Sequence, residues 1–211
     1  MNRPLPVTPR HVGRSEPAET APRTDLAAVD DLEYGVELLA ALPLHANRTR
    51  TQLRSWAAAA TAFGEALEPT PREAAPRVVE VTGGWDRGLL ARYTSRPPTV
   101  ELFTDSLAAA EELVAAHGWR SWFPAGSLRT AALAHEAVHA RLHHGPERTA
   151  LKQALGHTAL RLGRLRVLAH VAGAEEIAAH AHARVVCDLG RSPLLLSAAL
   201  TKATQQAPRE K

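Results

Sequence analysis

Apolar residues recur at helical spacing in the first ordered-looking part of the chain. In residues 30–42 and again in residues 47–67 they repeat every three to four positions, the period of an amphipathic helix. Pro43 separates the two segments, because proline cannot continue the interior of a helix. The pattern therefore predicts an N-terminal helical pair within residues 28–70.

Three short runs in the next part of the chain are typical of β-strands. They cover residues 77–82, 89–94 and 99–104, and each is rich in β-branched or aromatic residues. Gly83-Gly84 and the Ser95-Arg96-Pro97-Pro98 segment separate them, as expected for turns. The runs predict a small three-stranded sheet, and we expect residues 99–104 to form its edge strand.

The remainder of the chain is predicted to be helical. Apolar spacing and glycine punctuation place the expected helices at residues 105–117, 127–144, 146–171 and 174–189, with a last one from about Pro193. The fold class that follows is α+β and mostly helical, with the small sheet packed on the helix that begins near residue 127.

Composition narrows the class of protein. A chain of 211 residues fits one domain, alone or with an appended helical segment. Residues 1–27 are rich in proline and charge and have no apolar period, so we expect a disordered tail there. There is no signal-peptide pattern and no apolar run long enough to span a membrane, which predicts a cytoplasmic protein without a membrane partner.

Charge and cysteine content exclude two kinds of site. Cys187 is the only cysteine, which excludes a disulfide framework and a cysteine-based zinc site. The formal net charge is only +3, and the main basic cluster, Arg161, Arg164 and Arg166, is best explained as a solvated helix face. A nucleic-acid partner is therefore not expected.

The chemistry of the chain is concentrated in the pentad His135-Glu136-Ala137-Val138-His139. Residues four apart lie on one face of a helix, so His135 and His139 can point at one metal ion. Glu136 stands where a carboxylate can take a proton from a metal-bound water. With eleven histidines in the chain the pattern could arise by coincidence, but its helical context and the acidic helix downstream favour a zinc site.

A hydrolytic zinc site needs a third protein ligand, and the sequence offers three alternatives. Glu176 and His180 share one face of the predicted helix at 174–189, and either could reach the ion. If Glu176 is the ligand, His180 would lie near the open zinc position and could stabilise an oxyanion. The third alternative, His143 or His144, is disfavoured. His143 lies too far along the axis of the pentad helix, and local patterns with a third histidine fail because Gly145 stands where one requires histidine and Leu142 where another requires glycine.

Two segments resemble a known family. Leu128 to His139 resembles the active-site helix of the ImmA/IrrE-type metallo-endopeptidases, and Glu176-x-x-Ala179-His180-x-His182-Ala183 resembles their downstream motif. Residues 175–190 also resemble the corresponding helix in the zincin-like domain of ArdC-type antirestriction proteins. The resemblance extends over roughly residues 89–195, although its specific part is confined to these two helices.

The resemblance implies a minimal zincin, or gluzincin-like, domain that we place at residues 77–206. It implies His135, His139 and Glu176 as zinc ligands and Glu136 as the general base. Val138 replaces a glycine that is common in the family, and His180 and His182 stand where asparagine and an aromatic residue are usual.

The function expected from the sequence is that of a zinc-dependent metallo-endopeptidase, which hydrolyses peptide bonds of a protein or peptide substrate and has a regulatory role. His180 or Tyr93 could assist at the attacked carbonyl. The main alternative is a zinc-stabilised, non-catalytic module that binds a protein or DNA partner. A metal-dependent ribonuclease is a weaker alternative, because the histidine spacing after His139 does not fit one.

Overall fold

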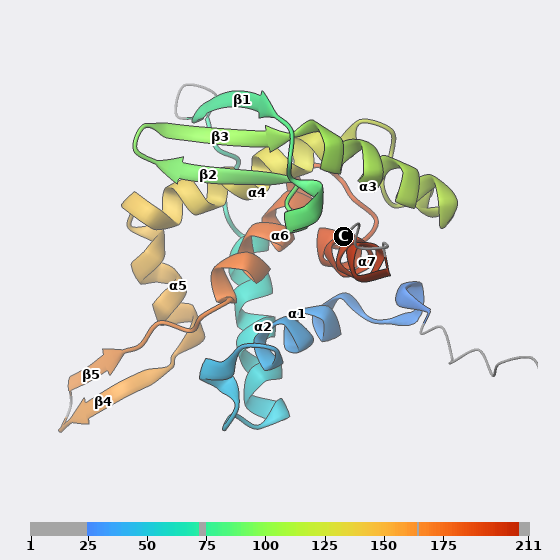
Figure 1. The fold of residues 1–211 in the computed structure, drawn as a ribbon. Coiled ribbons are helices and arrows are strands. Elements are labelled where there is room, and N and C mark those ends of the chain that lie inside the picture. The colour runs from blue at the N-terminus through green and yellow to red at the C-terminus, as the bar shows by residue number, and fades with distance from the viewer. Residues whose placement is uncertain (1–24, 72–74, 164, 207–211) are drawn as a thin grey trace, which may run out of the picture.

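The computed structural model describes residues 25–71, 75–163 and 165–206. Figure 1 shows a small sheet above a set of packed helices, with a two-stranded hairpin that projects from them. The fold is α+β and mostly helical, as predicted. Most of the expected tail at residues 1–27 lies outside the described residues.

The three predicted strands are present and form one mixed sheet. They are β1 (Arg77–Val81), β2 (Ala91–Ser95) and β3 (Pro98–Phe103), in the order β1-β3-β2. β3 pairs in parallel with β1 and antiparallel with β2. The prediction of residues 99–104 as the edge strand is therefore wrong: β3 is central. A tight turn makes β2 and β3 a hairpin, and β1 then pairs with the free side of β3.

Seven helices make up most of the described part of the chain. They are α1 (Asp31–Ala40), α2 (Arg50–Glu65), α3 (Thr104–Ala116), α4 (Ser127–His144), α5 (Glu147–Leu155), α6 (Ala174–Val186) and α7 (Pro193–Gln206). The side chains of Asp30 and Thr49 accept backbone N–H groups at the starts of α1 and α2. The predicted N-terminal helical pair is thus confirmed.

The prediction of one long helix at residues 146–171 is wrong. α5 ends at Leu155, Gly156 takes a left-handed conformation with φ of 60°, and the chain continues as β4 (Thr158–Leu162) and β5 (Leu165–Leu168). Leucine and arginine alternate here with the period of a strand, and cross-strand neighbours such as Leu160 and Val167 share one face. Arg164, and the side chains of Arg161 and Arg166, lie outside the described residues.

The central helices pack closely because small residues line their contact. Gly64 of α2 lies against the backbone of Ala178 of α6, where an added methyl group would fall on the Ala178 carbonyl. Leu39 and Trp56 from the helical pair share one buried cluster with Val138 of α4 and Ile177 of α6. The core thereby fixes α4 and α6 side by side (Figure 1).

In the described part of the chain, no helix is both long enough and apolar enough to cross a membrane.

Candidate metal centre

The histidines of the pentad lie on one face of α4, as their spacing predicts. The Nε2 atoms of His135 and His139 are 3.0 Å apart, and both side chains are largely buried. Two imidazole nitrogens held this close on a rigid helix can donate lone pairs to one cation.

Glu176 of α6 completes a compact triangle with these nitrogens. One carboxylate oxygen lies 3.3 Å from Nε2 of His135, and the other lies 3.2 Å from Nε2 of His139. Zinc–ligand distances of about 2.0–2.2 Å place the ligands of a tetrahedral site roughly 3.3–3.6 Å apart. The three separations are at or just below this range, so small side-chain movements would seat one ion.

The electrostatics of the triangle also suit a cation. Burial alone would raise the pKa of Glu176, but hydrogen bonds and charge from His135 and His139 outweigh it and hold that pKa far below its ordinary value. Burial alone would lower the pKa of His139, whereas its hydrogen bond with Glu176 raises it. Glu176 is therefore ionised at neutral pH and half exposed, with its charge facing the imidazoles.

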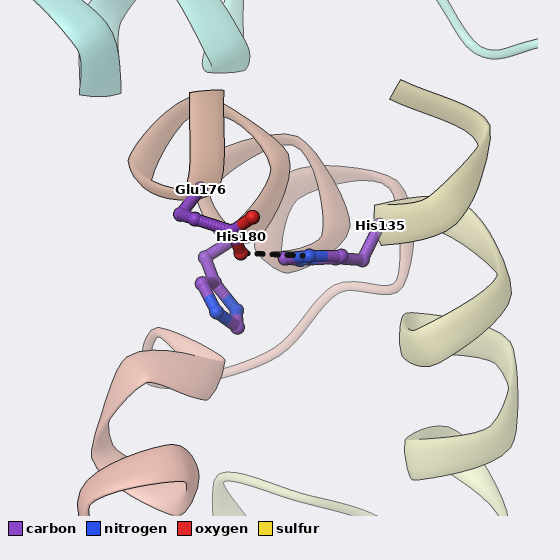
Figure 2. Close-up of side chains that lie close together, drawn as sticks. All are labelled: His135, Glu176 and His180. Atoms are coloured by element: carbon purple, nitrogen blue, oxygen red, sulfur yellow. Dashed lines mark ion pairs between the residues drawn. The ribbon is translucent and has the colours of Figure 1, made fainter. Parts of the chain in front are cut away.

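His180 lies one turn after Glu176 on α6 and borders the triangle. Its ring centroid is 4.3 Å from that of His135, and Figure 2 shows both rings beside the Glu176 carboxylate. Ligand atoms of His135, Glu176 and His180 all lie within 4.8 Å of one another, a wider set than the triangle with His139. The tighter set is our candidate for the site of an ion, and His180 would then lie beside that site.

Burial and the nearby charge of His135 keep His180 neutral. They lower the pKa of His180 well below its ordinary value. Within the described part of the structure, Nδ1 of His180 and Nδ1 of His135 are buried without a hydrogen-bond partner. Buried unpaired atoms call for an explanation such as a bound ion or water, but they are not specific to this site, because among the described residues Nδ1 of His182 and Oγ of Ser106 are also buried without a partner.

Glu136 points from α4 toward the edge of the sheet. It is buried, and its Oε2 accepts the backbone N–H of Tyr93 in β2 at 2.8 Å. The hydrogen bond fixes the carboxylate between the helix and the edge strand. Sequence reasoning identified Glu136 but gave no sign of this backbone partner, which depends on how β2 lies against α4.

The triangle, Glu136 and His180 all line one pocket with a volume of about 580 Å³. Its walls come from α4, from residues 88–93 at the start of β2, and from α6 and α7. Volumes of 300–1,000 Å³ are typical of sites that hold small molecules or short segments of chain. The contribution of α7 was not anticipated, although its apolar residues at positions 193, 196 and 200 have the spacing of a helix face.

The other candidate ligands lie outside the triangle. His143 lines the pocket, where its ring stands edge-on to Tyr93 at a centroid distance of 6.5 Å. The side chain of His144 lies outside the described residues. His182 is buried on another side of α6, and the Cys187 thiol is partly buried against the core, where burial raises its pKa.

Comparisons of the chain with protein-family models, curated proteins and solved structures gave no match.

Proposed function

We propose that the protein is a zinc-dependent metallo-endopeptidase with a protein or peptide substrate. The observation that carries the proposal is the compact triangle of His135, His139 and Glu176 beside Glu136 in one pocket. Two histidines and a glutamate form a catalytic ligand set that leaves one zinc position open. A bound zinc ion would polarise the peptide carbonyl and lower the pKa of the attacking water.

Within this proposal each side chain has a distinct task. Glu136 accepts a proton from the attacking water and passes it to the leaving amine, a role that needs a carboxylate fixed next to the substrate. The Tyr93 N–H supplies that fixation. His180, neutral and adjacent to the triangle, is placed to donate a hydrogen bond to the oxyanion.

The second candidate function is a zinc-stabilised regulatory module that binds a protein or DNA partner. It is favoured by the position of His180, because a set of His135, His139, Glu176 and His180 would close the coordination sphere. Closed sets of four protein ligands are typical of structural zinc. In that case Glu136 would have no chemical task.

Metal content and hydrolysis together test the proposal. Zinc per chain should be close to one in the wild type and in Glu136→Gln, and lost or sharply weakened in His135→Ala and Glu176→Gln. His182→Ala is the matched control, because His182 lies on the same helix but outside the triangle.

Hydrolysis is measured by mass spectrometry on a mixed peptide library. Glu136→Gln should reduce cleavage by about 10²–10⁴-fold, the usual contribution of a general base. The amide oxygen can still accept the Tyr93 N–H, so this variant should fold. If Glu136→Gln cleaves peptides as fast as the wild type, Glu136 is not the general base. If the wild type binds zinc but cleaves no peptide, the result supports the regulatory module.

A further inference from the structure

The pocket extends well beyond the metal centre. Its α4 residues run along one helix face from Leu128 to His143, at spacings of one, three or four. At 1.5 Å per residue this face is roughly 22 Å long. His135 and His139 occupy its middle, so the pocket continues past the centre toward both ends of the helix.

The two ends of the pocket differ in polarity. Toward the N-terminal end of α4 the walls are Leu128 and Ala131 together with Leu196 and Leu200 of α7, all of them 5 % exposed or less. Toward the other end the lining is mixed and includes Leu142 and His143 of α4 together with the charged residues Arg148 and Glu175. An apolar group in the pocket is therefore accommodated on one side of the metal centre.

The apolar end is built from the main core of the molecule. Leu128, Ala131, Leu196 and Leu200 belong to one buried cluster, and α7 is anchored there against α1, α3 and α6. The wall that α7 presents to the pocket is consequently fixed before any ligand arrives. A preformed apolar cavity favours an apolar group, because the apolar surface of the group that enters it is removed from water.

We infer that this apolar end is the specificity pocket of the site and accepts a bulky aliphatic or aromatic side chain of the substrate. The inference rests on the proposed function and narrows it to peptides with such a residue next to the cleaved bond. The preference is determined by four apolar side chains, those of Leu128, Ala131, Leu196 and Leu200. Ser197, which lies between the two α7 leucines in the sequence, also lines the pocket.

The test measures binding, without hydrolysis, to protein loaded with one equivalent of zinc. Two peptide-like hydroxamates are compared by calorimetry, identical except for one side chain next to the chelating group: methyl in one and isobutyl in the other. Each buried methylene favours binding by about fourfold, so the isobutyl compound should bind roughly 10- to 60-fold more tightly.

Ser197→Leu fills the apolar end and should reduce this ratio to below about threefold, while the methyl compound binds as it does to the wild type. Thr201→Leu is the matched control, since Thr201 is exposed one turn further along α7 and does not line the pocket. Arg148→Ala, at the polar end, should also leave the ratio unchanged. Ala131→Leu, on α4 at the same apolar end, is a second filling variant if Ser197→Leu unfolds.

The possible failures are distinguishable. Equal binding of the two compounds to the wild type, or an unchanged ratio in both folded filling variants, would overturn the specificity pocket and leave the proposed function intact. If neither hydroxamate binds the zinc-loaded protein, the centre has no open position, and both the proposed function and this assignment are wrong.

Discussion

Glu176 shows how single residues set the chemistry of this site. Its carboxylate stays ionised because two imidazoles donate to it, and one of them, His139, holds its proton more firmly as a result. Metal ligation requires an ionised carboxylate and neutral imidazoles. A cation that enters the triangle would therefore take the place of the Nε2 protons that His135 and His139 direct at Glu176.

His180 gives the sharpest prediction at the scale of one residue. If it lies beside the open position, His180→Ala should leave zinc affinity within about threefold of the wild type and reduce hydrolysis by about 10²–10³-fold, as for other oxyanion donors. Zinc affinity is measured by competition with a chelator. A loss of affinity greater than tenfold, without such a loss in His182→Ala, would show instead that His180 is a ligand.

Individual elements were predictable to different degrees. The strands were found because glycine and proline mark their ends, whereas their order was missed because pairing partners are chosen by contacts between distant residues. The hairpin at residues 158–168 was missed because leucine and arginine are also good helix formers. The period-two alternation and Gly163, at φ of 56°, were the signals that should have identified it.

The contact between α2 and α6 can be tested with one methyl group. Gly64→Ala places a methyl group on the Ala178 carbonyl, so it should destabilise the protein by about 1–3 kcal/mol although alanine favours helix. In Gly35→Ala, the matched control in α1, the nearest atom would be Cβ of Ala57 at 3.3 Å, and the loss should be smaller. Chemical denaturation of both variants measures the difference. Equal stability would show that α2 and α6 do not pack this closely.

Asp105 ties the start of α3 to the turn after β1. Its carboxylate accepts the N–H groups of Gly83, Gly84 and Trp85 at 2.9–3.3 Å. Desolvation would raise the pKa of Asp105, but these hydrogen bonds outweigh it and lower that pKa. A carboxyl whose pKa is lower in the folded state stabilises the fold above its unfolded pKa, and this stabilisation is lost as the pH falls through the folded value.

The pH dependence of Asp105 is measured against Asp105→Asn. The wild type should have the higher Tm at pH 7, and the difference between the two proteins should shrink as the pH falls below about 4. The Tm of each protein is measured by circular dichroism at pH 7 and at a pH below about 4. The other acids titrate alike in both proteins, so their effect cancels in the difference between the two Tm values. A constant difference would mean that the ionised carboxylate is not what the three N–H groups require.

For the whole molecule, the site was only partly predictable. The spacing of His135 and His139 was enough to place both on one face of α4, because helix geometry is local. Glu176 joined them through the packing of α4 on α6, which the alanines of both helices permit but do not specify. The Tyr93 N–H and the α7 wall had no local signal, since both depend on where the sheet and the last helix lie.

Because the triangle joins α4 to α6, zinc should stabilise the whole fold. Ligand that binds only the folded state adds about 2.7 kcal/mol at a hundredfold excess over Kd, which raises the Tm of a chain this size by roughly 5–11 °C. Scanning calorimetry with zinc and with a chelator should show this rise in the wild type and Glu136→Gln. The rise should be absent in His135→Ala and Glu176→Gln. If zinc still raises the Tm of Glu176→Gln, the third ligand is His180, because His180 is the other candidate ligand on α6 and would still link α6 to α4 through the ion.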